Sequence, residues 1–259
     1  MKKYLFLFTI GPVQSFIAQA RKPHDLYAGS RLLSNMTKLA VKKAKGSLSG
    51  DIELIFPAES VKSDPNRFIA IIETDTPETV GQELESFIIE RFWKFANILF
   101  KKIRSGHRKR ENFDKQIRGF FQIYWTALEY DENQHKEKYK DVERILGGVK
   151  NIRQFEQLEG ERGRKCSLCG ERNALFYKKN ADKKKPAYLQ NDAIKIRNLD
   201  QSEGLCAICF TKRFYKEKSR FPSTAKLALM DTLHHLRSNS GELLDSFEPE
   251  DKQDRILIL

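Results

Sequence analysis

The stretch Tyr4-Leu-Phe-Leu-Phe-Thr-Ile-Gly-Pro12 decides how the fold begins. Its apolar and aromatic side chains form an unbroken run that stops at a glycine and a proline, which is typical of a strand buried on both faces. Proline is favoured at the first position of a helix. Apolar residues then recur at helical spacing at Val13, Phe16, Ile17 and Ala20. We therefore predict a strand followed by a long helix, with Pro23 as a place where that helix could be interrupted.

Downstream of this helix, hydrophobic spacing predicts three more strands and one more helix. A turn-forming cluster, Ser63-Asp-Pro-Asn66, separates two of the strands, which should pair as a hairpin. A proline opens the helix, and aromatic residues dominate the last strand. We predict strands over residues 51–56 and 67–74, a helix over residues 77–104 and a last strand over residues 120–128.

The resulting order is β-α-β-β-α-β, the arrangement called ferredoxin-like, in which both helices cover one face of a four-stranded antiparallel sheet. The fold class is therefore α+β, and this domain occupies residues 1–135. The same topology underlies the palms of polymerases and cyclases, but also many unrelated binding domains. The fold alone leaves the function open.

The length and the amino-acid composition limit which classes of protein this chain can belong to. The chain has 259 residues, enough for one large domain or two modest ones, which excludes a disulfide-stapled miniprotein. Lys and Arg outnumber Asp and Glu by 47 to 35, so the net charge of +12 favours a polyanionic partner such as RNA, DNA or a nucleotide. A hydrophobic fraction of 40% excludes a disordered polycation. Because no apolar run approaches the roughly 20 residues of a membrane helix, we expect a soluble, cytoplasmic protein without membrane contact.

The second half of the chain divides into three regions by composition. We predict a helical connector over residues 136–163, a cysteine-bearing module over residues 164–210 and a helical segment over residues 211–259. Within the connector, the pattern predicts a helix from about Asp141 to Leu158, which Gly147-Gly148 weakens.

All four cysteines fall in two Cys-x-x-Cys pairs, Cys166/Cys169 and Cys206/Cys209. Two such hairpins can present four thiolates to one tetrahedral zinc ion, which would be structural because no coordination position stays open for water. Two disulfides are disfavoured in a cytoplasmic protein, and a redox site would need only one pair. We expect this module to have a core separate from that of the first domain.

The turn after the first strand is a candidate phosphate site. Free backbone N–H groups at a helix start can face an anion, which makes Gly11, Gln14 and Ser15 candidate nucleotide-binding residues. The alternative is a plain tight turn between strand and helix. Basic residues that follow could supply charge to a nucleotide or simply form a solvated face: Arg21, Lys22, His24 and Arg31.

Motifs for independent catalysis are missing from the sequence. A palm that joins nucleotides needs two carboxylates at a hairpin to hold two metal ions, yet Gly147-Gly148 is followed by Val149-Lys150. His24-Asp25 has the letters of a phosphohydrolase dyad without the companion His and Asp. We therefore predict no catalytic residues and no activity of the chain by itself.

A long motif carries a resemblance to a known family. The stretch Ile10-Gly-Pro-Val-Gln-Ser-Phe-Ile-Ala-Gln-Ala-Arg-Lys-Pro-His-Asp-Leu-Tyr-Ala-Gly-Ser-Arg-Leu-Leu-Ser34 resembles the first palm of the large, polymerase-like subunit of type III CRISPR effector complexes, especially the Cmr kind. The cysteine pairs look like that family's zinc-bearing insertion, and Phe221-Pro-Ser-Thr-Ala225 looks like the segment beyond it. The resemblance runs from Lys3 to at least Leu229.

The resemblance implies a truncated or split large subunit of an RNA-guided antiviral interference complex. It would supply the non-catalytic palm of an ATP-binding cyclic-oligoadenylate synthase, with ATP and Mg²⁺ bound only together with a second palm, for example on a separate polypeptide. The implied partners are neighbouring subunits, crRNA and target RNA. The main alternative is a stand-alone basic RNA-binding zinc protein that uses the palm as a scaffold. An independent nucleotidyltransferase is a weaker alternative, because no acidic pair stands at the expected hairpin.

Overall fold

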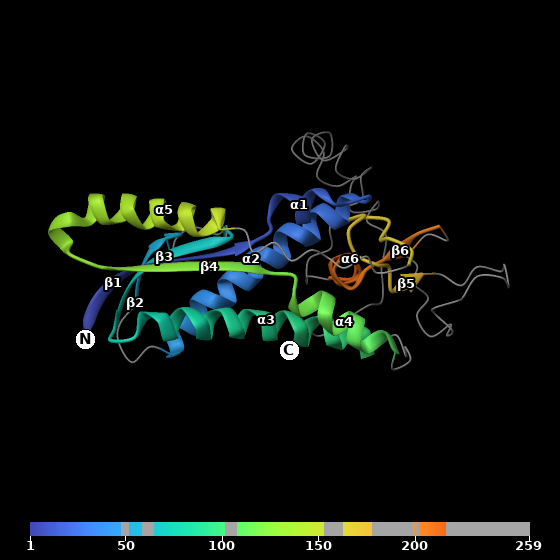
Figure 1. Cartoon of the computed structure of the whole chain (residues 1–259), viewed down its shortest axis with the longest axis horizontal. Helices are drawn as coiled ribbons and strands as arrows, with labels where there is room; N and C mark the ends of the chain where they lie inside the picture. The colour runs from blue at the N-terminus through green and yellow to red at the C-terminus, as the bar shows by residue number, and fades with distance from the viewer. Residues whose placement is uncertain are drawn as a thin grey trace, which may run out of the picture. The chain divides into compact units, whose positions relative to one another are not determined.

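The computed structural model describes residues 1–47, 52–58, 65–101, 108–152, 163–177, 199 and 202–215 (Figure 1). By its internal contacts the chain divides into Met1–Glu217 and Lys218–Leu259, and every described residue belongs to the first unit. Ser63 of the predicted turn, the basic loop at residues 178–185 and the predicted helices beyond residue 215 lie outside the described residues.

Within the described residues, four strands form one antiparallel sheet in the order β2-β3-β1-β4. The central strand is buried from Leu5 to Ile10, as its unbroken apolar run predicts. The hairpin of β2 and β3 is also confirmed. The strands are β1 (Lys2–Gly11), β2 (Ile52–Phe56), β3 (Arg67–Thr74) and β4 (Gln122–Glu129).

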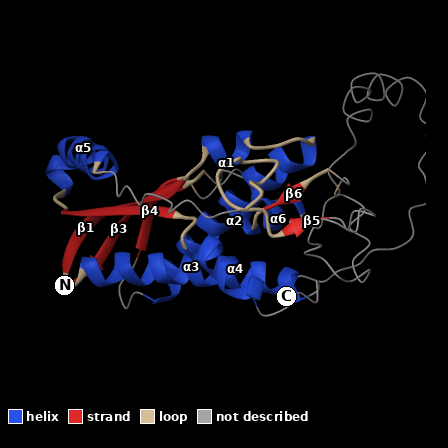
Figure 2. Ribbon diagram, turned by 45° about the vertical axis from the view of Figure 1, so that its right-hand side comes forward, coloured by secondary structure: helices blue, strands red, loops and turns tan. Residues whose placement is uncertain are grey.

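The first predicted helix is present as two. The break falls between Ala18 and Pro23, and Pro23 supplies the first residue of the longer helix, where its missing N–H is not needed. The longer helix and the helix that opens at Pro77 lie on the same face of the sheet (Figures 1 and 2). These helices are α1 (Gln14–Ala18), α2 (Pro23–Ser47) and α3 (Pro77–Lys101).

A helix that the sequence analysis did not predict precedes the last strand. Helix α4 (Arg108–Arg118) begins with a run of three basic residues, Arg108-Lys-Arg110. Its Phe113 and Ile117 are one turn apart and buried, so this face joins the core. Arg110 is paired inside the protein, with Asp114 at 2.8 Å and Asn97 at 2.6 Å.

The opposite face of the sheet is covered by α5 (His135–Asn151) (Figure 2). This helix begins six residues before the predicted start, because a short 3-10 turn, η1 (Glu132–Gln134), capped by the Asp131 side chain, leads directly into it. Val142 and Leu146 of α5 pack on Leu5, Leu7, Ile69 and Ile71 of β1 and β3. The predicted connector therefore belongs to the sheet's own packing.

A small unit follows in sequence. Two short strands, β5 (Phe176–Tyr177) and β6 (Gly204–Leu205), pair antiparallel, and α6 (Ala207–Arg213) follows directly. All seven residues of α6 are buried, including Lys212 and Arg213. A helix this short cannot form alone in water, so its stability must come from what it packs against.

The core of this small unit is continuous with the core of the sheet. One cluster of buried residues runs from Phe6 and Phe8 of β1 through α2 and α3 to Phe176, Phe210 and the cysteines. Our expectation of two separate cores is therefore wrong. So short a segment cannot bury its own apolar side chains, and Phe176 packs on Phe100 and Phe113 instead.

Candidate metal centre

The four cysteines come together at one point. Their sulfur atoms all lie within 4.8 Å of one another, and none takes part in a disulfide. The Sγ atoms of Cys169 and Cys206, from different pairs, are 3.8 Å apart. Four sulfurs around a tetrahedral zinc ion, with Zn–S bonds of about 2.3 Å, are separated by about 3.8 Å. The arrangement therefore fits one metal ion held by both pairs.

Each pair is shaped by its own backbone. In the first hairpin the Gly170 N–H bonds the Cys166 carbonyl at 2.9 Å, and Gly170 has a φ of 68°, a conformation that favours glycine. In the second pair, the Sγ of Cys206 accepts a bond from the Cys209 N–H at 3.4 Å and caps α6. A cysteine of the cluster therefore also defines where α6 begins.

The two hairpins are joined by backbone pairing between their flanks. The Ser167 N–H donates to the Gly204 carbonyl at 2.7 Å, and the Gly204 N–H donates to Ser167 Oγ at 3.0 Å. The Leu175 N–H donates to the Leu205 carbonyl at 2.8 Å. The pairs are thus held in position by hydrogen bonds independent of any ion.

Gln116, on α4, connects the two hairpins from the side of the sheet domain. Its Nε2 donates to the Asn173 carbonyl at 3.0 Å, and its Oε1 accepts the Ala207 N–H at 2.8 Å. Asn173 follows the first pair, and Ala207 lies inside the second. The sequence analysis did not identify Gln116, because the identity of a polar residue does not show which partners its side-chain amide will bond.

The pKa values of the four cysteine thiols are shifted in different directions. The hydrogen bond with Cys169 raises the pKa of Cys166, but bonds with the two later cysteines outweigh it and bring that pKa down to about 7. Hydrogen bonds from the other three thiols lower the pKa of Cys169. Burial raises the pKa of Cys206, and bonds with the other three thiols raise that of Cys209. Because three of the four cysteines are buried and all four sulfurs lie close together, the thiols cannot all lose their protons without a cation among them.

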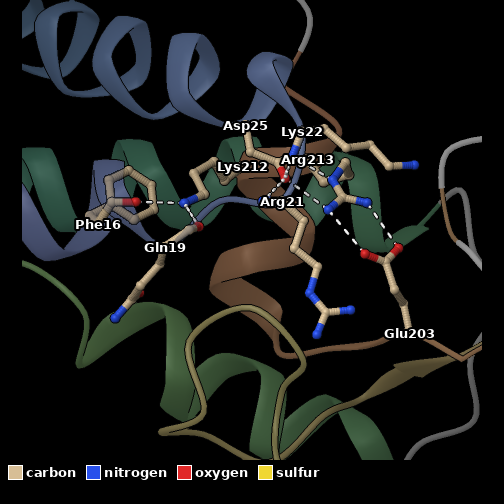
Figure 3. A network of polar contacts seen from close by, with 8 residues as sticks. All are labelled: Phe16, Gln19, Arg21, Lys22, Asp25, Glu203, Lys212 and Arg213. Atoms are coloured by element: carbon tan, nitrogen blue, oxygen red, sulfur yellow. Dashed lines mark hydrogen bonds and ion pairs between the residues drawn. The ribbon is translucent and has the colours of Figure 1, made fainter.

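Lys212 and Arg213, on the helix that follows the second pair, contact the chain around the break between α1 and α2 (Figure 3). Lys212 Nζ donates to the carbonyl oxygens of Phe16 and Gln19, each at 2.5 Å. These carbonyls lie at the end of α1, where backbone carbonyl groups lack a donor within the helix. The Gln19 side chain bonds Glu171 of the first hairpin at 2.8 Å. The break between α1 and α2 is thus held by both cysteine hairpins.

A buried ion-pair network lies beside it (Figure 3). Arg213 is paired with Asp25 through both carboxylate oxygens, with an Nη2–Oδ2 distance of 2.8 Å, and with Glu203 at 3.1 Å. Burial acts to lower the pKa of Arg213, but the bonds to Asp25 and Glu203 outweigh it and raise that pKa. Asp25 also accepts the N–H groups of Arg21 and Lys22 at 3.1 and 3.2 Å, at the start of α2. Asp25 therefore has a structural role.

The predicted nucleotide residues lie at the end of β1. Gly11 ends the strand beside Gln122, and a Cβ there would meet the Gln122 carbonyl at 3.4 Å. Gln14 and Ser15 are exposed on α1, a helix of five residues without a side-chain cap. So short a helix has little dipole, so the first helix offers less to an anion than the long helix that we expected.

These observations define a class of protein: an antiparallel sheet with helices on both faces, joined through one core to a four-cysteine cluster. Comparison with known proteins agrees. The family model for the N-terminal part of the CRISPR-associated protein Cmr2 matches residues 5–63. The Cmr subunit Cmr2 of Pyrococcus furiosus is 26% identical over an alignment that covers 87% of this chain and 33% of the relative. The chain thus spans about a third of that relative's length.

Solved structures show the same fold. The type III-B Cmr-beta complex bound to cognate target RNA contains a chain with a TM-score of 0.59 and 14% identity, covering 93% of this chain and 38% of that one. The apo state of Cmr-beta gives the same TM-score and identity over 96% of this chain and 38% of that one. The chain is Cmr2-like, and the resemblance seen in the sequence is confirmed. No helix in the described part of the chain is both long and apolar enough to cross a bilayer.

Proposed function

We propose that the described residues form the first palm and zinc-bearing portion of a Cmr2-like subunit in a type III CRISPR effector complex. The observation that carries this proposal is the alignment with Cmr2 over 87% of the chain, together with the family-model match at residues 5–63, which contain the strand-turn-helix motif. In such a complex this portion would dock to neighbouring subunits around crRNA and target RNA.

The sheet supports the palm assignment. Its order β2-β3-β1-β4, with helical segments between β1 and β2 and between β3 and β4, is the order of a ferredoxin-like domain. The extra helix α5 on the second face is an addition to that pattern. We propose the domain limits 1–135, 136–163, 164–210 and 211–259 as functional regions, although packing crosses the first two of these boundaries and α6 spans the third.

The metal we propose is zinc, held by Cys166, Cys169, Cys206 and Cys209. Four thiolates at tetrahedral spacing are the donor set of structural zinc sites. The ion would supply the positive charge that lets all four closely spaced thiols ionise. It would not take part in chemistry, since the four sulfurs complete its coordination.

We propose that the edge of the palm at Gly11, Gln14 and Ser15 faces ATP when a second palm supplies the carboxylates for Mg²⁺. Exposure of Gln14 and Ser15 supports this role, because neither side chain is needed in the core. The close approach of Gly11 to Gln122 explains why a larger residue would disturb the turn. Without the metal-binding carboxylates, transition-state stabilisation worth several kcal/mol is missing, so the chain alone should make no cyclic oligoadenylate.

Reconstitution tests this proposal. The tagged chain is expressed with a second-palm polypeptide, neighbouring Cmr subunits and crRNA, and the purified material is tested for bound RNA and for ATP-dependent cyclic product. We expect co-purification of subunits and crRNA, with product only in the assembly. Gln14→Ala and Ser15→Ala should reduce product, whereas Ser30→Ala, also exposed on the neighbouring helix, should not. Cyclic product from the chain alone would contradict the proposal.

The net charge of +12 favours a second candidate, a stand-alone RNA-binding zinc protein. It predicts binding to single-stranded RNA by the chain alone that weakens steeply with salt. Salt-sensitive binding without any co-purifying subunit would favour this candidate over the first.

A further inference from the structure

Two consecutive basic residues of α6 carry information beyond the metal site itself. Lys212 and Arg213 have relative exposures of 0% and 1%, although long basic side chains are rarely fully buried. They follow Cys209 by only three and four positions, yet their partners lie near the other end of the sequence, on α1 and α2.

Two residues of helix α2 accommodate Lys212 and Arg213. Asp25 and Gly29 are four residues apart and therefore lie on the same face of α2. Asp25 binds Arg213, and a Cβ at Gly29 would come within 3.2 Å of Lys212 Cδ. The absence of a side chain at Gly29 makes room for the aliphatic stem of Lys212. These positions lie inside the motif Asp25-Leu-Tyr-Ala-Gly29, whose spacing the docked pair explains.

The arrangement ties the cysteine cluster to the turn after β1. Cys206 caps α6, so binding of an ion at the cysteines fixes the start of that helix. If α6 moved, Lys212 and Arg213 would lose their partners, and a buried charge without a partner is strongly unfavourable. Phe16 and Gln19 would in turn lose the cation that bonds their carbonyls (Figure 3).

We propose that Lys212 and Arg213 are positioning residues that couple metal binding at the four cysteines to the order of residues 16–25. The inference rests on the proposed zinc site and does not depend on nucleotide binding. Coupling between two sites is reciprocal. Metal loss must therefore loosen the break between α1 and α2, and a change that loosens this break must weaken metal binding.

The first experiment compares Lys212→Met with Lys94→Met. Lys94 is an exposed residue of α3 whose contact with Glu90 is a surface ion pair, so it is a matched control. We measure Zn²⁺ affinity by chelator competition, and hydrogen exchange over residues 14–25, in the whole chain. Lys212→Met should keep one zinc equivalent, bind it about tenfold more weakly, and exchange residues 14–25 about tenfold faster or more. Lys94→Met should change neither.

The second experiment leaves every polar group in place. Gly29→Ala crowds the Lys212 stem, whereas a Cβ at Gly46 on the same helix meets nothing within 4 Å. Gly29→Ala should weaken zinc binding, and Gly46→Ala should not. This comparison keeps the proposal testable if Lys212→Met fails to fold.

The outcomes separate the two proposals. Faster exchange at residues 14–25 with unchanged zinc affinity, in Lys212→Met or in Gly29→Ala, would overturn the coupling alone, because coupling must act in both directions. Unchanged exchange and affinity in both variants would overturn it as well. Absence of zinc binding in the wild-type chain would overturn the zinc assignment and the coupling with it.

Discussion

The two faces of the sheet are covered in different ways. On one face, α2 and α3 build a continuous core that extends through α4 and α6 to the four cysteines. On the other face, Val142 and Leu146 of α5 pack on four buried sheet residues: Leu5, Leu7, Ile69 and Ile71. The cysteine cluster therefore belongs to the main core of the domain, whereas α5 contacts the sheet through a smaller, separate cluster of buried residues.

The largest effect should come from removing metal ligands. Replacing Cys166 and Cys169 with Ser should abolish zinc binding and lower the free energy of unfolding by several kcal/mol, because binding energy at a structural zinc site is folding energy. The loss should reach α2 and α3 through the shared core. Metal analysis and denaturant unfolding measure both effects, and α5 with its smaller cluster should change least.

Retention of stoichiometric zinc in this double variant would contradict the assignment of the ligands. Full retention of stability after loss of zinc would contradict the shared core. Serine replacement on the surface, at Lys94 for example, serves as the control, because its side chain is 60% exposed.

Two equally buried leucines, one on each face of the sheet, allow the packing of the two faces to be compared directly. Leu84 of α3 and Leu146 of α5 each have a relative exposure of 2%. Leu84→Ala should cost at the upper end of the range of about 2–5 kcal/mol for buried leucines, and Leu146→Ala at the lower end. The reason is that α5, with few neighbours, can shift to fill a cavity. Equal costs in chemical denaturation would remove the distinction between the faces.

The contact from Gln116 is the next test. Gln116→Leu keeps the approximate volume but leaves the Ala207 N–H and the Asn173 carbonyl without their side-chain partner, at about 1–3 kcal/mol for each buried group. Zinc affinity should fall together with stability, because both hairpins lose a common support. Gln122→Leu at the exposed start of β4 is the control. Unchanged zinc affinity in Gln116→Leu would show that the hairpins hold each other without α4.

The smallest effects should differ in sign between the faces. A Cβ at Gly81 of α3 would lie 2.2 Å from the Trp125 ring, so Gly81→Ala should destabilise by about 1–3 kcal/mol. At Gly147 of α5 a Cβ meets nothing within 4 Å, so Gly147→Ala should stabilise by up to about 1 kcal/mol through helix propensity. Thermal unfolding of the two variants measures both signs, and a shift of the same sign would refute this packing account.

Local sequence patterns predicted much of the sheet domain. The unbroken apolar run of β1, the hairpin of β2 and β3 and the proline-initiated α3 all follow from short-range periodicity and turn chemistry. Helix α4 was missed because its basic residues obscured two apolar positions, Phe113 and Ile117. The predicted start of α5, at about Asp141, came too late for the same reason, since charge dominates the composition of its first residues.

The candidate metal centre was likewise only partly predictable from the sequence. The paired cysteines were evident from spacing, because two hairpins in one chain can meet at one ion. The residues that integrate this cluster with the sheet were not, since Gln116, Lys212 and Arg213 act through partners far away in sequence. Buried basic residues resemble solvated ones in a sequence, and only the folded chain distinguishes them.

The most direct test of the shared core is calorimetry of the zinc-bound chain before and after treatment with a chelator. We predict that zinc removal lowers the unfolding temperature of the sheet itself, which is monitored by the near-ultraviolet signal of Trp125 on β4 and Trp93 on α3, the helix packed on the sheet. If the sheet unfolds at the same temperature with and without zinc, and only residues 163–215 lose protection from hydrogen exchange, the cysteine cluster is an independent module and the account is wrong.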